Sequence, residues 1–287
     1  MAGERTRAAI AAQPEWLAQV PTGVRLPEGR VAAVGCGTSF HAALACGRAT
    51  PALDVVLGRA PEADVLVAIS HEGGTPLTVE AAESFAGPRW LVTGKVDSPL
   101  GALADEVVLA TPALEESYCH TASYTCAVAA LAALRGEGVA WLSEAVAAVL
   151  EGDRLPVSGH ERFLVAGAGR DWPTAQEAAL KLREGVHVAA EAHRLEELLH
   201  GHLAAVDETV RCLVLEGEGR AAARAAGAVA ALRALGCDVT LVSSRHPVVD
   251  IVPFQLLTVD LAAARGIDPD PIRRDDPRWQ AARDAYA

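Results

Sequence analysis

The chain has few positive charges and almost no lysine. Lys95 and Lys181 are its two lysines, and its formal net charge is −12 at pH 7. Nucleic-acid backbones are bound by clustered lysine and arginine, and the sequence shows no such basic patch. We therefore expect no nucleic-acid partner, although backbone N–H groups can still hold a small anion locally.

Paired cysteines and long apolar segments are also missing. The six cysteines form no Cys-x-x-Cys motif, which favours reduced thiols and a cytoplasmic location. The first 16 residues mix acids with arginines and contain no signal-peptide core. The longest apolar run, Cys126 to Leu134, is too short to cross a bilayer, so we expect no membrane partner.

Aromatic residues make up only 4% of the chain, whereas 51% of it is hydrophobic. This composition predicts a core of alanine, valine and leucine, as in helices packed closely on a sheet. With 287 residues, the chain is long enough for one large α/β domain or for two domains of ordinary size.

A repeated pattern favours two domains. The stretches VAAVGCGTSFHAALA, from Val31, and FLVAGAGRDWPTAQEA, from Phe163, each contain an apolar strand, Gly-x-Gly and a helix start. A repeat of this length indicates a domain duplication. Strands alternating with helices in both halves predict parallel sheets covered on both faces. Further strands are expected at 63–70, 88–94, 104–110, 209–217 and 237–244, and helices at 76–85 and 221–235.

The boundary between the two domains is expected in the polar stretch 151–162. Glycine, proline and charge interrupt the strand and helix pattern there. We predict an N-terminal helical segment at 1–24, a first domain at 25–152, a second at 153–270 and a C-terminal tail at 271–287.

The glycine loops resemble a dinucleotide-binding motif only in part. The third glycine is replaced by Phe40 and Trp172, so a nicotinamide site is not favoured. Hydroxyls follow two predicted strands of the first half instead. They can donate to a phosphate together with helix N-terminal N–H groups, or they can simply cap the helices. The spacing leaves both interpretations open for Thr38, Ser39, Ser70 and Thr75.

The stretch 179–202 is unusually rich in charge, because 11 of its 24 residues are charged or histidine. Glu177, Lys181 and Glu184 stand at positions i, i+4 and i+7, so they share one helical face. Such a face belongs to a solvated helix or to a catalytic segment. For His187, His193 and His202 no tight ligand spacing appears, and we expect no metal site.

Four segments together resemble the tandem sugar isomerase (SIS) family: GCGTSFHAA, ISHEGGT, AQEAALKLREGVHVAAEAHRLEELLHGHLAAVD and IVPFQLLTVDLAAARGIDPDPIRR. The chain looks most like the isomerase half of glucosamine-6-phosphate synthase and related deaminases and isomerases. The resemblance implies two flavodoxin-like three-layer (αβα) sandwiches in a homodimer. It also implies phosphate contacts at Ser39, Ser70, His71 and Thr75, a proton-shuttling Glu184 and a ring-opening His200.

These roles fit the chemistry of an aldose–ketose interconversion. Ring opening suits an imidazole, and the transfer between C1 and C2 suits one carboxylate that takes and returns the proton. Lys181 would hold Glu184 ionised or bind the sugar. We therefore predict a cofactor-free phosphosugar isomerase or amino-sugar-phosphate deaminase, with its phosphate site in the loops Gly37–Ser39 (Gly37, Thr38, Ser39) and Ser70–Thr75 (Ser70, His71, Glu72, Thr75).

The sequence departs from the family pattern at three places. No glutaminase domain precedes residue 31, and the tail has no lysine to form a Schiff base with a ketose, so amination of fructose 6-phosphate is not expected. Glu72 stands where the family has serine. A carboxylate about 4 Å from a phosphate is repelled by roughly 4 kcal/mol per unit charge at an effective dielectric near 20. Glu72 must point away, or His71 and an arginine must offset it, or the ligand is not a simple phosphosugar.

Two other functions stay open at this stage: a sugar-phosphate sensor without turnover, and a deglycase of a sugar–amine adduct. Glu184 and His200 favour an enzyme, because a sensor needs no proton shuttle. One straight helix between these two residues would separate them by roughly 24 Å. We therefore expect a loop between them or, as the resemblance implies, a site shared between two subunits.

Overall fold

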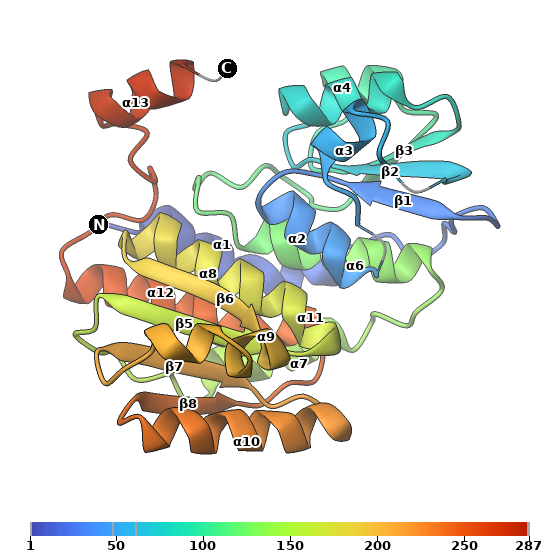
Figure 1. Ribbon diagram of the computed structural model, residues 1–287. Coiled ribbons are helices and arrows are strands. Elements are labelled where there is room, and N and C mark those ends of the chain that lie inside the picture. Colours follow the sequence, from blue (N-terminus) through green and yellow to red (C-terminus); the bar gives the residue numbers. More distant parts are fainter. Residues whose placement is uncertain (1, 48, 61, 286–287) are drawn as a thin grey trace.

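The computed structural model describes residues 2–47, 49–60 and 62–285, and it contains two parallel four-stranded sheets (Figure 1). The first sheet has the order β1-β2-β3-β4 and the second the order β6-β5-β7-β8. The strands of the first are β1 (Val31–Val34), β2 (Val65–Ile69), β3 (Arg89–Thr93) and β4 (Glu106–Leu109); those of the second are β5 (Arg162–Gly167), β6 (Ala189–Arg194), β7 (Val210–Leu215) and β8 (Asp238–Val242).

Both sheets follow a flavodoxin-like strand order. In the second sheet the earliest strand, β5, lies between β6 and β7, which is the order 2-1-3-4. In the first sheet the place of the edge strand beside β1 is taken by a single parallel bridge between Ala33 and Ala49. The predicted α/β class with two parallel sheets is therefore confirmed. Each sheet has four strands, one fewer than the five-stranded flavodoxin sheet.

The strands predicted from apolar runs are confirmed, and β6 is the strand that the sequence did not predict. All residues of β2 and β7 are buried, as expected for strands covered on both faces. β6 is an edge strand of mixed polarity that lies between Glu184 and His200. No straight helix joins these two residues, because α8 (Trp172–Val186) ends before β6 begins.

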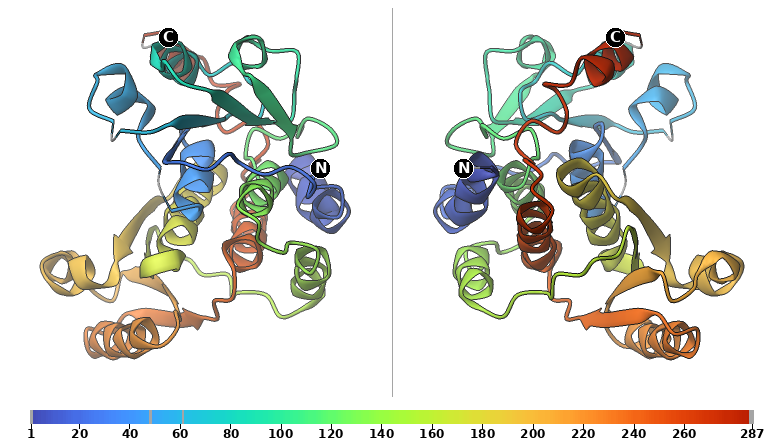
Figure 2. Two further views of the ribbon diagram at one scale, coloured as in Figure 1. Left: turned by 90° about the vertical axis from the view of Figure 1, so that its right-hand side faces the viewer. Right: turned by 90° about the vertical axis from the view of Figure 1, so that its left-hand side faces the viewer.

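Helices form a layer between the two sheets and a layer outside each of them (Figure 2). The central layer contains α1 (Glu4–Leu17), α2 (Thr38–Ala45), α6 (Ala122–Leu134), α7 (Leu142–Glu151), α8, α11 (Pro247–Asp250) and α12 (Val252–Ala264). Outside the first sheet lie α3 (Ala52–Val56), α4 (Pro76–Ser84) and α5 (Pro99–Leu103), and outside the second lie α9 (Leu195–Leu199) and α10 (Arg220–Ala234). The tail ends in α13 (Pro277–Asp284).

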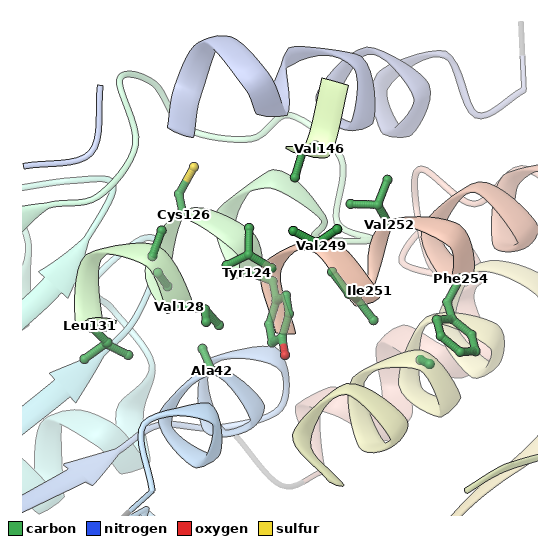
Figure 3. Close-up of a cluster of buried hydrophobic side chains, with 14 of the residues drawn as sticks. Ala42, Tyr124, Cys126, Val128, Leu131, Val146, Val249, Ile251, Val252 and Phe254 are labelled. Carbon is green, nitrogen blue, oxygen red and sulfur yellow. The ribbon is translucent and has the colours of Figure 1, made fainter. Parts of the chain in front are cut away.

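One hydrophobic core joins the two halves of the chain. All 13 residues of α6 are buried, α6 packs on α11, and its side chains share one cluster with those of α7 and α12 (Figure 3). The helical stretch Pro247–Ala264 is long and apolar enough to span a membrane by composition, but 78% of it is buried inside the protein. It serves here as a core element. The division of the chain at residues 24, 152 and 270 stays a prediction.

The repeated Gly-x-Gly has the same structural role in both halves. A Cβ on Gly35 would lie 2.8 Å from the carbonyl carbon of Ser39, and one on Gly167 would lie 2.9 Å from the carbonyl oxygen of Asp171. The second glycine of each motif is left-handed, with φ of 56° at Gly37 and 57° at Gly169. Only glycine permits both the close approach and the turn at low cost.

Candidate active site

A pocket of about 660 Å³ opens at the carboxyl-terminal edge of the first sheet. The end of β3 and the loops that follow β1, β2 and β4 contribute to its wall, which is where parallel α/β sheets bind ligands. The wall includes all seven residues that the sequence assigned to a phosphate site, together with Glu184 from the second half of the chain: Gly37, Thr38, Ser39, Ser70, His71, Glu72, Thr75 and Glu184.

The hydroxyls in the two glycine loops do not cap their helices. Gly37 occupies the cap of α2, and Thr75, at the cap of α4, makes no side-chain capping bond. The hydroxyls of Ser70 and Thr75 lie 3.3 Å apart. Since α2 and α4 both begin at the pocket, their N–H groups and positive dipole ends face the same space as these hydroxyls. Capping therefore does not explain the hydroxyls.

Lys181 is a fully buried cation behind the pocket wall. Its Nζ donates to Oε2 of Glu184 at 2.6 Å and lies 3.4 Å from Oε1 of Glu177. Burial alone would lower the pKa of Lys181, but Coulombic attraction to the two carboxylates outweighs it and raises the pKa. The shared helical face predicted for these three residues is confirmed; Glu177 and Lys181 on it are fully buried, and the Glu184 side chain is 24% exposed.

The same cation connects the phosphate loop to Glu184. Nζ of Lys181 also donates to Oγ1 of Thr38 at 3.1 Å, and Thr38 donates to Oε1 of Glu177 at 3.1 Å. Oε2 of Glu177 is hydrogen-bonded to Nδ1 of His41 at 2.7 Å. A carboxylate only accepts, so Nδ1 of His41 carries the proton. The network fixes α2 against α8 at the point where Glu184 reaches the pocket.

His71 is a neutral acceptor in this structure. Its Nε2 accepts the backbone N–H of Glu115 at 2.8 Å, and burial lowers its pKa to about 4. It therefore carries no charge near neutral pH and does not offset Glu72. Of the alternatives set out above for Glu72, compensation by His71 is therefore excluded; Glu72 itself is exposed.

Arg274 is an arginine of the pocket wall that was not predicted from the sequence as a site residue. It lines the pocket together with exposed Glu72, and its guanidinium carbon lies 4.0 Å from the ring centre of Tyr118. Asp270, four residues earlier, ties this segment to α1, because its carboxylate accepts from the backbone N–H groups of Arg5 and Thr6. Tyr118 donates its N–H to the Asp270 carbonyl at 3.0 Å. The start of the tail is thus tied to α1 and to the segment before α6, and Arg274 lines the pocket.

Glu115 and His120 form a second polar cluster that the sequence analysis missed. Glu115 is buried and accepts the N–H and hydroxyl of both Thr121 and Ser123, at the start of α6. Although burial opposes ionisation, these donors and His120 together lower the pKa of Glu115 to about 2. The available signal was a polar segment between the last predicted strand and an apolar helix, at the same sheet edge as the glycine loops.

His200 lies outside this pocket. It follows α9, its side chain is 74% exposed, and its Nε2 lies 3.3 Å from Glu196. Residues of the pocket wall do not include it. The ring centres of His193 and His202 lie 4.3 Å apart with the rings tilted by 38°, and no group of three metal-ligating side chains occurs within the described residues.

The fold and the pocket define a two-sheet α/β protein with a polar small-molecule site. No family model matches the chain. It is 27% identical, over 84% of its length, to glutamine–fructose-6-phosphate aminotransferase (isomerizing) of Zymomonas mobilis, of which the match covers 50%. The chain thus spans about half the length of the curated relatives it matches.

Solved structures share the whole fold. Tagatose-6-phosphate ketose/aldose isomerase from Escherichia coli has a TM-score of 0.78 at 18% identity, covering 94% of this chain and 95% of that chain. Glucosamine-6-phosphate deaminase from Thermotoga maritima has a TM-score of 0.76 at 20% identity, covering 93% and 97%. The fold is that of the tandem SIS proteins, and the resemblance drawn from the sequence is confirmed.

Proposed function

We propose that the protein is a phosphosugar isomerase or amino-sugar-phosphate deaminase. One observation carries the proposal: Glu184 stands in the wall of the pocket that holds the hydroxyl loops, with the ammonium of Lys181 buried behind it. A binding module needs the hydroxyls but has no use for a carboxylate held by a buried cation. The similarity to enzymes with isomerase and deaminase activities supports the same conclusion.

The phosphate group would bind between the starts of α2 and α4. Ser39, Ser70 and Thr75 offer hydroxyl donors there, and both helix N-termini offer N–H groups and favourable dipoles. Arg274 supplies a positive charge in the same pocket wall, and Glu72 is exposed. The predicted repulsion therefore does not exclude a phosphosugar.

The sugar carbons would lie against Glu184. In an isomerisation this carboxylate takes a proton from C1 or C2 and returns it to the other carbon, so one group serves as base and then as acid. Lys181 stays protonated because of its two carboxylate neighbours. It therefore acts as a fixed positive charge that positions Glu184, and it is not available as an amine nucleophile.

The assignment of ring opening to His200 stays a prediction, and so does the homodimer in a cytoplasmic setting. His200 is exposed and away from its own chain's pocket wall. It would have to enter the pocket of a second subunit, as the family resemblance implies.

Glu72 favours an amino-bearing substrate over a neutral hexose. A carboxylate in the pocket wall attracts an ammonium group, as on an amino-sugar phosphate or a sugar–amine adduct, and it repels further negative charge. This observation supports deamination, or deglycation of an adduct, as the second candidate beside isomerisation.

Thermal denaturation with a panel of ligands tests the proposal. Fructose, glucose and glucosamine 6-phosphates are compared with the same sugars lacking phosphate, because a ligand of the native state raises the melting temperature. We expect at least one phosphosugar at millimolar concentration to stabilise the protein while its unphosphorylated partner does not. Equal behaviour of every phosphorylated and unphosphorylated pair would contradict a phosphosugar site.

A further inference from the structure

We propose that Asp171 and Asp250 form a buried carboxyl pair that shares one proton and acts as a pH-sensitive latch between α8 and α11. The two helices pack against each other in the second half of the chain (Figure 1). The pair lies at the carboxyl-terminal edge of the second sheet, so its role goes beyond the proposed function and does not depend on which ligand the pocket binds.

The glycine loop of the second half encloses a carboxyl group. Asp171 stands four residues after Gly167, as Ser39 stands four residues after Gly35 in the first half. Ser39 lines the open pocket, whereas Asp171 is 1% exposed and directly precedes α8 without capping it. The second loop is therefore closed around a titratable side chain of its own.

Asp250, at the end of α11, is the other member of the pair and is 3% exposed. Two adjacent residues of the loop after β8 hold the two carboxyl groups. The hydroxyl of Ser244 donates to Oδ2 of Asp171 at 3.1 Å, and the backbone N–H of Arg245 donates to Oδ1 of Asp250 at 2.7 Å. The N–H of Gly217 donates to the Ser244 hydroxyl in turn. This loop thus connects the start of α8 to α11.

Each carboxyl group has one oxygen that no donor satisfies. Oδ1 of Asp171 and Oδ2 of Asp250 are buried and have no hydrogen-bond partner within the described residues. Two carboxylates buried near each other repel, and a buried acceptor without a donor loses its solvation. One proton relieves both costs, because a protonated carboxyl group can donate a hydrogen bond to an ionised one.

The ionisable groups around the pair do not cancel this repulsion. Arg170 lies beside it, but the arginine is 43% exposed and forms an ion pair with Glu218. His246 is neutral near pH 7, because burial lowers its pKa to about 4. Tyr124, which faces Asp250 from α6, is neutral because burial raises its pKa. The pair therefore needs its own proton.

The pKa shifts of the pair have the matching direction. Burial raises the pKa of Asp250 to about 6, and the charge of Asp171 adds to this although two backbone N–H groups oppose it. Burial also raises the pKa of Asp171. An aspartate in the unfolded chain has a pKa of about 3.9. The folded state thus keeps a proton at pH values where the unfolded state has lost it.

The sign of the pH effect follows from this difference. The shared proton stabilises the fold fully below about pH 4, and its contribution is lost as the pH rises through about 6. Above that pH the proton passes to solvent and two carboxylates repel each other where α8 begins. Because α8 also carries Glu184, a loosened α8 start affects the helix that reaches the pocket.

Carbon-13 NMR of protein labelled at the aspartate carboxyl carbons tests for the proton in the parent chain. We expect one resonance to titrate near pH 6 and to be missing in Asp250→Asn. The asparagine amide can donate to Asp171 as the protonated acid does, so this variant keeps the hydrogen bond. If every aspartate titrates below about pH 5, both carboxyl groups are ionised and hydrated, and the proposal is wrong.

Melting temperatures at about pH 4.5 and about pH 8 test the effect on stability. Relative to the parent, Asp250→Asn should gain at least about 3 °C between the two pH values. Asp171→Asn should gain in the same direction, and the double variant no more than the better single variant. Asp153→Asn is the matched control at an exposed position and should follow the parent. Parallel profiles of parent and Asp250→Asn, or additive gains, would contradict a shared proton.

Hydrogen exchange followed by mass spectrometry tests the latch itself. After correction for the intrinsic pH dependence of exchange, peptides covering α11 and the start of α8 should lose protection at least about fivefold between the same pH values. Peptides of α10 should keep theirs, and Asp250→Asn should lose protection nowhere. Unchanged protection in the parent would show that α8 and α11 stay together when the pair ionises, which overturns the latch and leaves the proposed function untouched.

Discussion

Nζ of Lys181 lies 2.6 Å from Oε2 of Glu184 while the lysine side chain is completely buried. A buried ammonium is stable only when carboxylates compensate its charge. Glu177 is the second carboxylate beside Lys181, with its Oε1 3.4 Å from Nζ. The arrangement makes Lys181 a fixed positive charge that positions Glu184, the proposed acid/base group.

Replacing this lysine should destabilise the protein strongly. Lys181→Met leaves the fully buried Glu177 without its cation, which costs about 3–5 kcal/mol in the free energy of unfolding. Urea denaturation measures the change. Lys95→Met is the matched control, because Lys95 is exposed and its loss should cost less than about 0.5 kcal/mol. A loss below 1 kcal/mol for Lys181→Met would show that the cation is dispensable.

The double variant Ser70→Ala/Thr75→Ala tests the phosphate loop. Both hydroxyls lie in the pocket wall without serving as caps. A bond to a charged acceptor contributes about 1.5–3 kcal/mol, so affinity for a phosphosugar should fall at least about tenfold. Affinity for the unphosphorylated sugar should hardly change, as measured by calorimetry. Equal losses for both ligands would show that these hydroxyls do not recognise phosphate.

Arg274→Ala tests the contribution of the tail. The arginine lines the pocket and stacks on Tyr118. Its removal takes a positive charge out of a wall that also contains the Glu72 carboxylate, so phosphosugar affinity should fall roughly tenfold and recover in part at high salt. Arg278→Ala is the control, because that side chain is 79% exposed and outside the wall. Unchanged affinity in Arg274→Ala would remove the tail from the site.

His71 predicts a specific pH dependence of stability. Its pKa is about 4 when folded and about 6.5 in the unfolded chain, so the unfolded state binds a proton first as the pH falls. The contribution of neutral His71 to the free energy of unfolding is complete above pH 6.5. It is lost between pH 6.5 and 4, at about 1 kcal/mol per pH unit. His71→Gln, whose amide oxygen can still accept from Glu115, should show a correspondingly shallower slope. Parallel curves for parent and variant would contradict the buried neutral state.

The apolar strands could be predicted from the sequence because a strand buried on both faces, such as Val65–Ile69, consists of apolar residues only. It missed β6, whose alternating small, charged and histidine residues resemble the helix before it. It also missed His120, Glu115 and Arg274, because their positions at or beside the pocket depend on contacts between distant segments. The Asp270 carboxylate binds the start of α1, and its carbonyl accepts the N–H of Tyr118. No local sequence pattern predicts these contacts between distant segments.

The central claim is that Glu184 moves a proton between the sugar carbons. The direct measurement is deuterium incorporation from deuterated water into fructose 6-phosphate or glucosamine 6-phosphate, whichever binds, followed by NMR. The parent protein should place deuterium at C1 or C2, and Glu184→Gln should reduce the rate at least about a hundredfold while binding the ligand with similar affinity. Incorporation at an undiminished rate in Glu184→Gln would contradict the account, as would tight binding by the parent with no incorporation.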